Sequence, residues 1–268
     1  MKPPGHEHRP AVWWAWATIR TLYGWTALAL LTLVVALTYI AWLRVAGHGS
    51  RFLYRLERFW VWTTLWASNA KVRVRGMENV RPGESYIVMG NHRSMYDIPV
   101  VHYYLGKDRD LRWIGKQELL KVPLFGQAFG VSRHIAIDRQ RRHRGIAALK
   151  QAAAGSAEGV SFVIMPEGTR SRDARLLPFK RGPFHLAIDT GLPILPVAIA
   201  GSEKMMRKGT WWILPGTIDL TVLPPIPVTG LGKDSMDDLS DRVREAIRAA
   251  LPDEPGGDGA GKRERSDR

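Results

Sequence analysis

The longest apolar run in the chain lies near its beginning. Residues 21–43 form 23 consecutive uncharged positions, mostly Leu, Ala, Val and Thr. As a helix, this run would be about 35 Å long, enough to cross the hydrocarbon core of a bilayer. Aromatic side chains lie near both ends, as interfacial anchors do: Tyr23, Trp25, Tyr39 and Trp42. The pattern predicts a retained membrane helix, because the apolar core of a cleavable signal peptide is shorter.

A second apolar stretch, at 59–70, is too short to cross a bilayer and is rich in tryptophan. Its composition favours a segment that lies in the membrane interface. A re-entrant pair of helices in one leaflet is therefore an alternative to a single span. More basic residues follow the long run than precede it, which favours attachment to the inner or cytoplasmic membrane with the following domain facing the cytoplasm.

After Lys71, short β-type runs alternate with helical ones. The predicted strands are 86–89, 111–114, 132–137, 161–165, 194–200 and 218–223. The predicted helices are 95–105, 118–129, 142–154, 182–190 and 236–251. This alternation predicts an α/β fold: a single domain with a mostly parallel or mixed sheet flanked by helices.

The boundaries of this domain follow from composition. A Ser235/Asp238 capping box is expected to begin the last helix, whose apolar positions lie along one face. After Pro252 the chain is rich in Gly, Pro and charge, which predicts a disordered tail. The expected organisation is therefore a membrane-attachment region at 1–70, a domain at 71–251 and a tail at 252–268.

Charge narrows the class of partner. The formal net charge is +14 and the pI is about 10.3, so an anionic partner is expected. No predicted element combines clustered Lys and Arg with stacking aromatic residues, which argues against a nucleic-acid surface. The absence of cysteine excludes disulfides, thiolate metal sites and a cysteine nucleophile.

The first segment suited to chemistry is Gly-Asn-His-Arg-Ser-Met-Tyr-Asp at 90–97, directly after a predicted strand. Sites in open α/β sheets form at this end of the strands. On one helix, five residues would turn His92 and Asp97 about 140° apart, so the two can pair only across a loop-to-helix junction. There Asp97 would orient the imidazole and His92 would act as a general base. Alternatively, Ser94 and Asp97 form a capping box and His92 is a turn residue.

The second segment, Met-Pro-Glu-Gly-Thr-Arg at 165–170, follows another apolar strand. Its glycine-containing loop presents backbone amides and the guanidinium of Arg170, which together can bind a phosphate. The alternative is a local ion pair between Glu167 and Arg170 in a tight turn.

These two segments resemble those of the glycerolipid acyltransferase family, in particular the lysophosphatidic acid (1-acyl-sn-glycerol-3-phosphate) acyltransferases. That family has an Asn-His-x-x-x-x-Asp block, matched by Asn91, His92 and Asp97, and a Glu-Gly-Thr-Arg block, matched by 167–170. Segments 130–139 and 192–197 resemble two further blocks in the right order. The resemblance covers about residues 70–225, and four ordered blocks are far more specific than one.

The resemblance implies a glycerol-3-phosphate acyltransferase-like fold and transfer of a fatty acyl group to the hydroxyl of a lysophospholipid, with phosphatidic acid as the usual product. The acyl donor would be a thioester of coenzyme A or of acyl carrier protein, used as co-substrate, with no bound cofactor and no metal. His92 and Asp97 are the candidate catalytic residues. The candidate substrate-binding residues are Asn91, Lys116, Arg139, Glu167, Gly168, Thr169, Arg170 and Lys180.

Three alternatives remain open from the sequence. The acceptor can be another amphiphile, such as glycerol 3-phosphate, a lyso-ornithine lipid or a glycolipid, because a general base is indifferent to the rest of the acceptor. The chain can also be a non-catalytic basic protein that binds anionic lipid.

Finally, the segment 204–208 with Trp211 and Trp212 mixes cations and aromatic rings, which suits either a loop that enters the membrane interface or a core hairpin.

Overall fold

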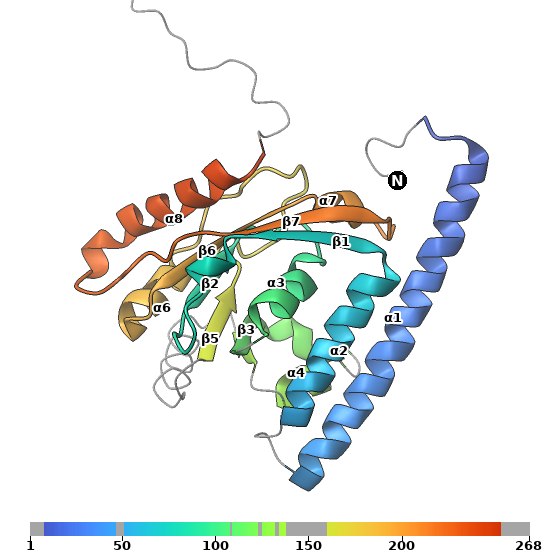
Figure 1. The fold of residues 1–268 in the computed structure, drawn as a ribbon, viewed down its shortest axis with the longest axis horizontal. Coiled ribbons are helices and arrows are strands. Elements are labelled where there is room, and N and C mark those ends of the chain that lie inside the picture. The colour runs from blue at the N-terminus through green and yellow to red at the C-terminus, as the bar shows by residue number, and fades with distance from the viewer. Residues whose placement is uncertain are drawn as a thin grey trace, which may run out of the picture.

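The computed structural model describes residues 8–46, 51–107, 109–122, 125–131, 134–137 and 160–252. Within them, one seven-stranded sheet forms the centre of the domain, in the order β1-β7-β6-β2-β5-β3-β4 (Figure 1). The strands are β1 (Ala70–Arg75), β2 (Ile87–Gly90), β3 (Asp110–Lys116), β4 (Ile135–Ile137), β5 (Val160–Ile164), β6 (Ile194–Ala200) and β7 (Gly216–Val222). All neighbours pair in parallel except β6 and β7, which are antiparallel. The prediction of a mostly parallel or mixed sheet is confirmed.

The burial of each strand follows its position in the sheet. Every residue of β2 and β6 is buried, as expected for central strands covered on both faces. Strand β1 instead alternates between half-buried and exposed residues, because it lies at the edge. Strand β1 is absent from the strands predicted above, although its Lys and Arg residues occur at every second position, as in a half-exposed strand.

Helices cover both faces of the sheet (Figure 1). On one face lie α2 (Arg51–Ala67) and α3 (Asp97–Leu105), which share a core with β2, β6 and β7. On the other face lie α6 (Gly182–Thr190) and α8 (Met236–Ala250), which bury a second apolar cluster against β2, β5 and β6. The other short α-helices among the described residues are α4 (Phe125–Val131) and α7 (Ser202–Met205).

The structure departs from two local expectations, and two others lie outside the described residues. Instead of one helix at 118–129, the chain forms a 3₁₀ turn at Gln117–Lys121 and then α4; Pro123 disfavours a continuous helix because it lacks a backbone N–H. The capping box expected at Ser235 is wrong, since its side chain makes no capping hydrogen bond and a 3₁₀ turn at Lys233–Ser235 leads into α8 instead. The expected helix at 142–154 and the tail from 253 onward lie outside the described residues.

Helix α1 (Ala11–Ala46) has 36 residues and is long and apolar enough to cross a membrane, judged by length and composition. It runs beside α2 along one side of the domain (Figure 1). Much of its outer surface is apolar and exposed, through Val12, Ile19, Leu22, Leu30, Val34, Leu37 and Val45. An uncovered apolar surface of this extent is typical of a membrane contact.

The first half of α1 also contacts the α/β domain. Ala17 packs in a small cluster with Trp212 and Leu214. The backbone N–H of Ile213 donates to the Thr21 hydroxyl at 3.2 Å, and Trp25 Nε1 donates to the carbonyl oxygen of Trp211 at 2.7 Å. Segment 211–214 therefore joins α1 to the domain, which no local sequence pattern indicated.

Helix α8 provides a direct test of the core. Leu239 is fully buried against β6 and α6, so Leu239→Ala should lower the free energy of unfolding by about 2–5 kcal/mol. Arg242→Ala, on the exposed face of the same helix, should change it by less than about 0.5 kcal/mol. Denaturant unfolding of the detergent-solubilised protein measures both, and equal losses would contradict the described packing of α8.

Candidate active site

The two motif segments leave the sheet side by side. Strands β2 and β5 are parallel neighbours, with Met89 opposite Ile164. The segments that follow, 91–97 and 165–172, therefore begin at the same edge of the sheet. Strand β6 is the parallel neighbour of β2 on the other side, so the chain after Ala200 also begins at this edge. Three segments that are distant in sequence meet here.

The carboxylate of Asp97 is fully buried at the first residue of α3. Its Oδ2 lies 2.8 Å from His92 Nδ1 and accepts the backbone N–H groups of Arg93 at 2.7 Å and Ser94 at 2.8 Å. Its Oδ1 accepts the hydroxyl of Ser202 at 2.5 Å. Because an ionised carboxylate only accepts hydrogen bonds, Nδ1 of the imidazole carries the proton. The lone pair on His92 Nε2 is then available to accept a proton.

The hydrogen bonds of Ser94 bear on the capping interpretation of the first motif. Ser94 is not the N-cap of α3, because the helix begins at Asp97 with Tyr96 as its N-cap. The Ser94 hydroxyl donates to the Met206 carbonyl oxygen at 2.8 Å and accepts from the Tyr96 N–H at 3.2 Å. Asp97 accepts the Ser94 N–H, as the acid of a capping box does. The same carboxylate therefore closes the turn and orients His92.

Glu167 links the second motif to the first. It is 2 % exposed, and its carboxylate accepts the backbone N–H of His92 at 2.7 Å and that of Leu177 at 3.2 Å. The alternative of a Glu167–Arg170 ion pair is wrong, because the carboxylate is directed to these two amides. Burial raises the pKa of Glu167 to about 7, and the charge of Asp97 adds to the rise, while the two amides and Arg93 oppose it.

The loop after Glu167 brings Arg170 to the histidine. Gly168 has a φ of 70°, a left-handed conformation that favours glycine. The backbone N–H of Ser171 donates to the carbonyl oxygen of His92 at 2.8 Å. Arg170 is half-buried; burial lowers its pKa and the charge of Asp97 raises it, so the two groups interact across the site. A guanidinium stays positive at neutral pH in such surroundings.

The other predicted residues occupy different places. Asn91 is fully buried, and its amide exchanges hydrogen bonds of 2.8 and 2.7 Å with the backbone of Ile199, joining β2 to β6. It therefore does not reach the surface of the site, in contrast to the substrate-binding role that the family resemblance implies. Lys116 ends β3 with an exposed side chain. Lys180 has an exposed side chain, and its backbone N–H donates to the Pro166 carbonyl oxygen at 2.8 Å.

Arg139 lies outside the described residues. The two remaining positions of the second motif, Gly168 and Thr169, belong to the loop that carries Arg170. The hydroxyl of Thr169 accepts a hydrogen bond from Lys208 Nζ at 2.8 Å.

The segment after β6 contributes residues that sequence reasoning missed. Ser202 holds Asp97, the Met206 carbonyl oxygen accepts the Ser94 hydroxyl, and Lys208 Nζ donates to Thr169 Oγ1 and to the Arg170 carbonyl oxygen. The sequence pattern of 204–208 predicts only an interface loop or a core hairpin. A signal was available, because the segment directly follows a buried strand whose end lies at the site edge.

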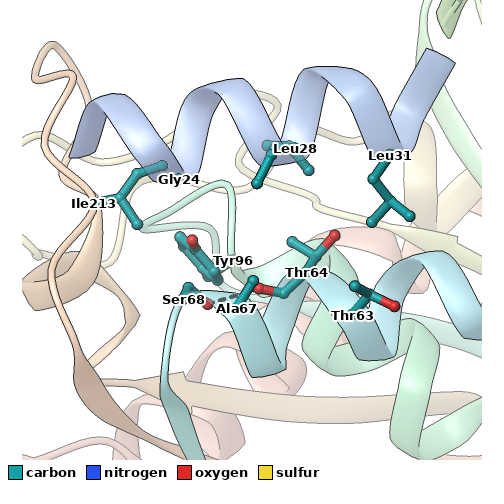
Figure 2. A pocket seen from close by; sticks show the side chains of 10 residues that line it. Gly24, Leu28, Leu31, Thr63, Thr64, Ala67, Ser68, Tyr96 and Ile213 are labelled. Carbon is teal, nitrogen blue, oxygen red and sulfur yellow. Dashed lines mark hydrogen bonds between the residues drawn. The ribbon is translucent and has the colours of Figure 1, made fainter. Parts of the chain in front are cut away.

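A cavity of about 50 Å³ lies beside the histidine motif, between α1 and α2. Figure 2 shows Gly24, Leu28 and Leu31 of α1 facing Thr63, Thr64 and Ala67 of α2, with Tyr96 and Ile213 at one end. Tyr96 immediately precedes Asp97 in the chain. The space between the two N-terminal helices thus reaches the turn that carries the His92–Asp97 pair.

Comparison with known proteins identifies the family. A family model described as Acyltransferase matches residues 71–200. A 1-acyl-sn-glycerol-3-phosphate acyltransferase of Chlamydomonas reinhardtii is 30 % identical over 247 residues, which cover 89 % of this chain and 71 % of that protein. The chain belongs to the acyltransferase family. Another member, a 1-acyl-sn-glycerol-3-phosphate acyltransferase of Limnanthes douglasii, is 34 % identical over 191 residues, or 70 % of this chain and 66 % of the relative.

The fold is also shared with a solved acyltransferase. The crystal structure of the 1-acyl-sn-glycerophosphate acyltransferase PlsC from Thermotoga maritima matches with a TM-score of 0.72 at 24 % identity, covering 87 % of this chain and 95 % of that one. This likeness confirms the predicted fold.

The buried acid of the second motif gives a pH test. Because the pKa of Glu167 is raised when folded, the unfolded chain ionises first, and this residue makes stability fall between pH 4.5 and about 7. The difference in unfolding free energy, wild type minus Glu167→Gln, should therefore decrease by about 3 kcal/mol across this window.

Glu245→Gln is the matched control for this measurement. Glu245 is exposed and its pKa is lowered, mainly by its hydrogen bond with Arg248. Its contribution to the free energy of unfolding therefore varies mainly below pH 4.5 and not between pH 4.5 and 7. Denaturant unfolding at several pH values measures both differences. A Glu167 difference that does not vary between pH 4.5 and 7 would show that folding does not raise the pKa of this carboxyl group.

Proposed function

We propose that this chain transfers a fatty acyl group from an acyl thioester to the free hydroxyl of lysophosphatidic acid, producing phosphatidic acid. The observation that carries the proposal is the contact between the two motifs, in which the Ser171 N–H donates to the His92 carbonyl oxygen. This contact holds the loop of Arg170 against an imidazole that is paired with Asp97. The relatives named 1-acyl-sn-glycerol-3-phosphate acyltransferases support the choice of acceptor.

His92 is the general base in the proposed reaction. Nε2 takes the proton of the acceptor hydroxyl as the oxygen attacks the thioester carbonyl carbon. The tetrahedral intermediate then collapses, the carbon–sulfur bond breaks, and the thiolate leaves and receives the proton from the imidazolium. Asp97 keeps the ring in the correct tautomer and stabilises its positive charge. Coenzyme A and acyl carrier protein both present such a thioester.

The loop of Arg170 binds the phosphate of the acceptor in this proposal. A guanidinium can donate two parallel hydrogen bonds to phosphate oxygens, and its partial burial strengthens them. The hydroxyl to be acylated lies a few bonds from that phosphate, so anchoring the phosphate places the hydroxyl near His92. Glu167 and Asn91 are then positioning residues, because both are buried and bonded to backbone groups.

We further propose that residues 1–70 attach the catalytic domain, 71–251, to the cytoplasmic face of a membrane as a re-entrant helix pair. The support is that both the beginning of α1 and the end of α2 contact the domain. The backbone N–H of Ile213 donates to the Thr21 hydroxyl of α1, while α2 leads into β1 and packs against α3. Arg20 of α1 also donates to the carbonyl oxygen of Ser68, beside the end of α2, at 2.6 Å. A single span would separate one of these ends from the domain.

The central test removes the base. His92→Ala should lower the rate of acyl transfer by about 10²–10⁴-fold, and Asp97→Asn should also impair it severely because the tautomer is no longer controlled. The assay measures transfer of a labelled acyl group from coenzyme A to lysophosphatidic acid in membranes. His185→Ala, on α6 and outside the site, is the control. Equal activity of wild type and His92→Ala would refute the proposed mechanism.

The role of Arg170 is tested separately. Arg170→Ala should raise the KM for lysophosphatidic acid by about 10–100-fold with a smaller change in kcat, because it removes a charged hydrogen bond to bound acceptor. Arg175→Ala is the control, since Arg175 lies further along the same loop and pairs with Asp173. If Arg170→Ala left KM unaltered and lowered only kcat, Arg170 would act in the chemical step instead.

A further inference from the structure

Lys208 lies where the segment after β6 meets the loop of Arg170, and none of the roles assigned above includes it. Its Nζ donates to Thr169 Oγ1 at 2.8 Å and to the Arg170 carbonyl oxygen at 2.7 Å. An ammonium group has three N–H donors. Two of them meet these acceptors, and among the described residues no further acceptor is bonded to Nζ. One donor therefore remains for a ligand.

The neighbourhood of this ammonium group is strongly cationic. Partial burial lowers the pKa of Lys208, and the charges of Arg172, Arg170 and Lys116 lower it further. Glu167 opposes them, but its carboxylate is already bonded to two backbone amides. Positive charges thus converge from the ends of β3, β5 and β6, and an anion among them would relieve their repulsion.

The backbone around Lys208 is held in place before any ligand binds. The carbonyl oxygen of Met206 accepts the Ser94 hydroxyl at 2.8 Å, and Ser94 forms an isolated β-bridge with Arg207. Arg207 Nε donates to the carbonyl oxygen of Arg172. The Nε of Arg207 is therefore bonded to the backbone of the Arg170 loop, whereas Lys208 retains one N–H donor. Fixing a binding group in advance reduces the entropy lost on binding.

We infer that Lys208 is a direct ligand of the acceptor's phosphate and makes the site select phosphomonoester over phosphodiester head groups. This inference rests on the proposed function. A phosphomonoester carries up to two negative charges and three terminal oxygens, as a phosphorylated side chain does. A diester carries one charge and two such oxygens, so it satisfies fewer of the converging cations. The inference adds a basis for head-group specificity from a segment outside both motifs.

The experiment compares Lys208→Met with Lys204→Met, the same change at an exposed lysine of α7 four residues earlier. The KM for lysophosphatidic acid is measured for each variant, together with the inhibition constants of dodecyl phosphate and dodecyl methyl phosphate. These two probes share one chain and differ as monoester and diester. Lys208→Met should raise the KM by about 10-fold or more, the range expected for a lost hydrogen bond to a charged group.

The ratio of the two inhibition constants distinguishes direct binding of the phosphate by Lys208 from a purely structural role in holding the loop of Arg170. If Lys208 binds the phosphate, Lys208→Met should reduce the preference for the monoester by about 10-fold, whereas Lys204→Met should leave it unchanged. If Lys208 only holds the Arg170 loop, both inhibition constants should rise by the same factor, and the inference is overturned. An unaltered KM and ratio would overturn it as well.

The experiment also covers a variant that does not fold and a wild-type protein that lacks the proposed activity. If Lys208→Met does not fold, as judged by its thermal unfolding midpoint, Lys208→Gln is used with the same criteria. A wild-type protein that transfers no acyl group to lysophosphatidic acid refutes the proposed function. In that case calorimetric binding of dodecyl phosphate to wild type and Lys208→Met still tests the lysine: equal affinities overturn the inference and weaker binding by the variant supports it.

Discussion

The site depends on the burial of one carboxylate. Asp97 is inaccessible to solvent and accepts hydrogen bonds from His92, from the backbone amides of Arg93 and Ser94, and from Ser202. Burying an ionised carboxylate costs several kcal/mol unless donors replace the lost water. Here the donors come from the turn after β2 and from α7 after β6. The requirement to satisfy this charge therefore holds two distant segments together and fixes the imidazole between them.

Glu167, which follows the neighbouring strand β5, also connects two segments of the site. Its buried carboxylate accepts backbone amides from His92 and Leu177, so the loop after β5 closes on the histidine turn. This arrangement needs no contact between the carboxylate and a substrate. It explains how a motif residue can be indispensable to the shape of a site while its own side chain is only 2 % exposed.

The connection between β6 and β7 joins the site to the N-terminal helices. Its first part contacts Asp97 and the loop of Arg170 through Ser202 and Lys208. Its second part, 211–214, contacts α1 through hydrogen bonds and aromatic packing. A single segment therefore reaches from the helix with the exposed apolar face to the cationic part of the site. In our proposal, this continuity holds the phosphate-binding side close to the membrane from which the acceptor arrives.

Local pattern alone determined much of this protein. The apolar run of α1, the buried strand β6 and helix α6 follow from periodicity and length. The rotation of a helix also indicated that His92 and Asp97 could pair only across a loop-to-helix junction. Strand β1 was not predicted although its alternation of apolar and charged residues is a local strand signal. Its pairing with β7, where Arg73 meets Asp219 146 residues away, was decided only by the tertiary structure. Ser202 and Lys208 entered the site only through the parallel pairing of β6 with β2. Such pairings depend on contacts between remote residues, which no local sequence pattern specifies.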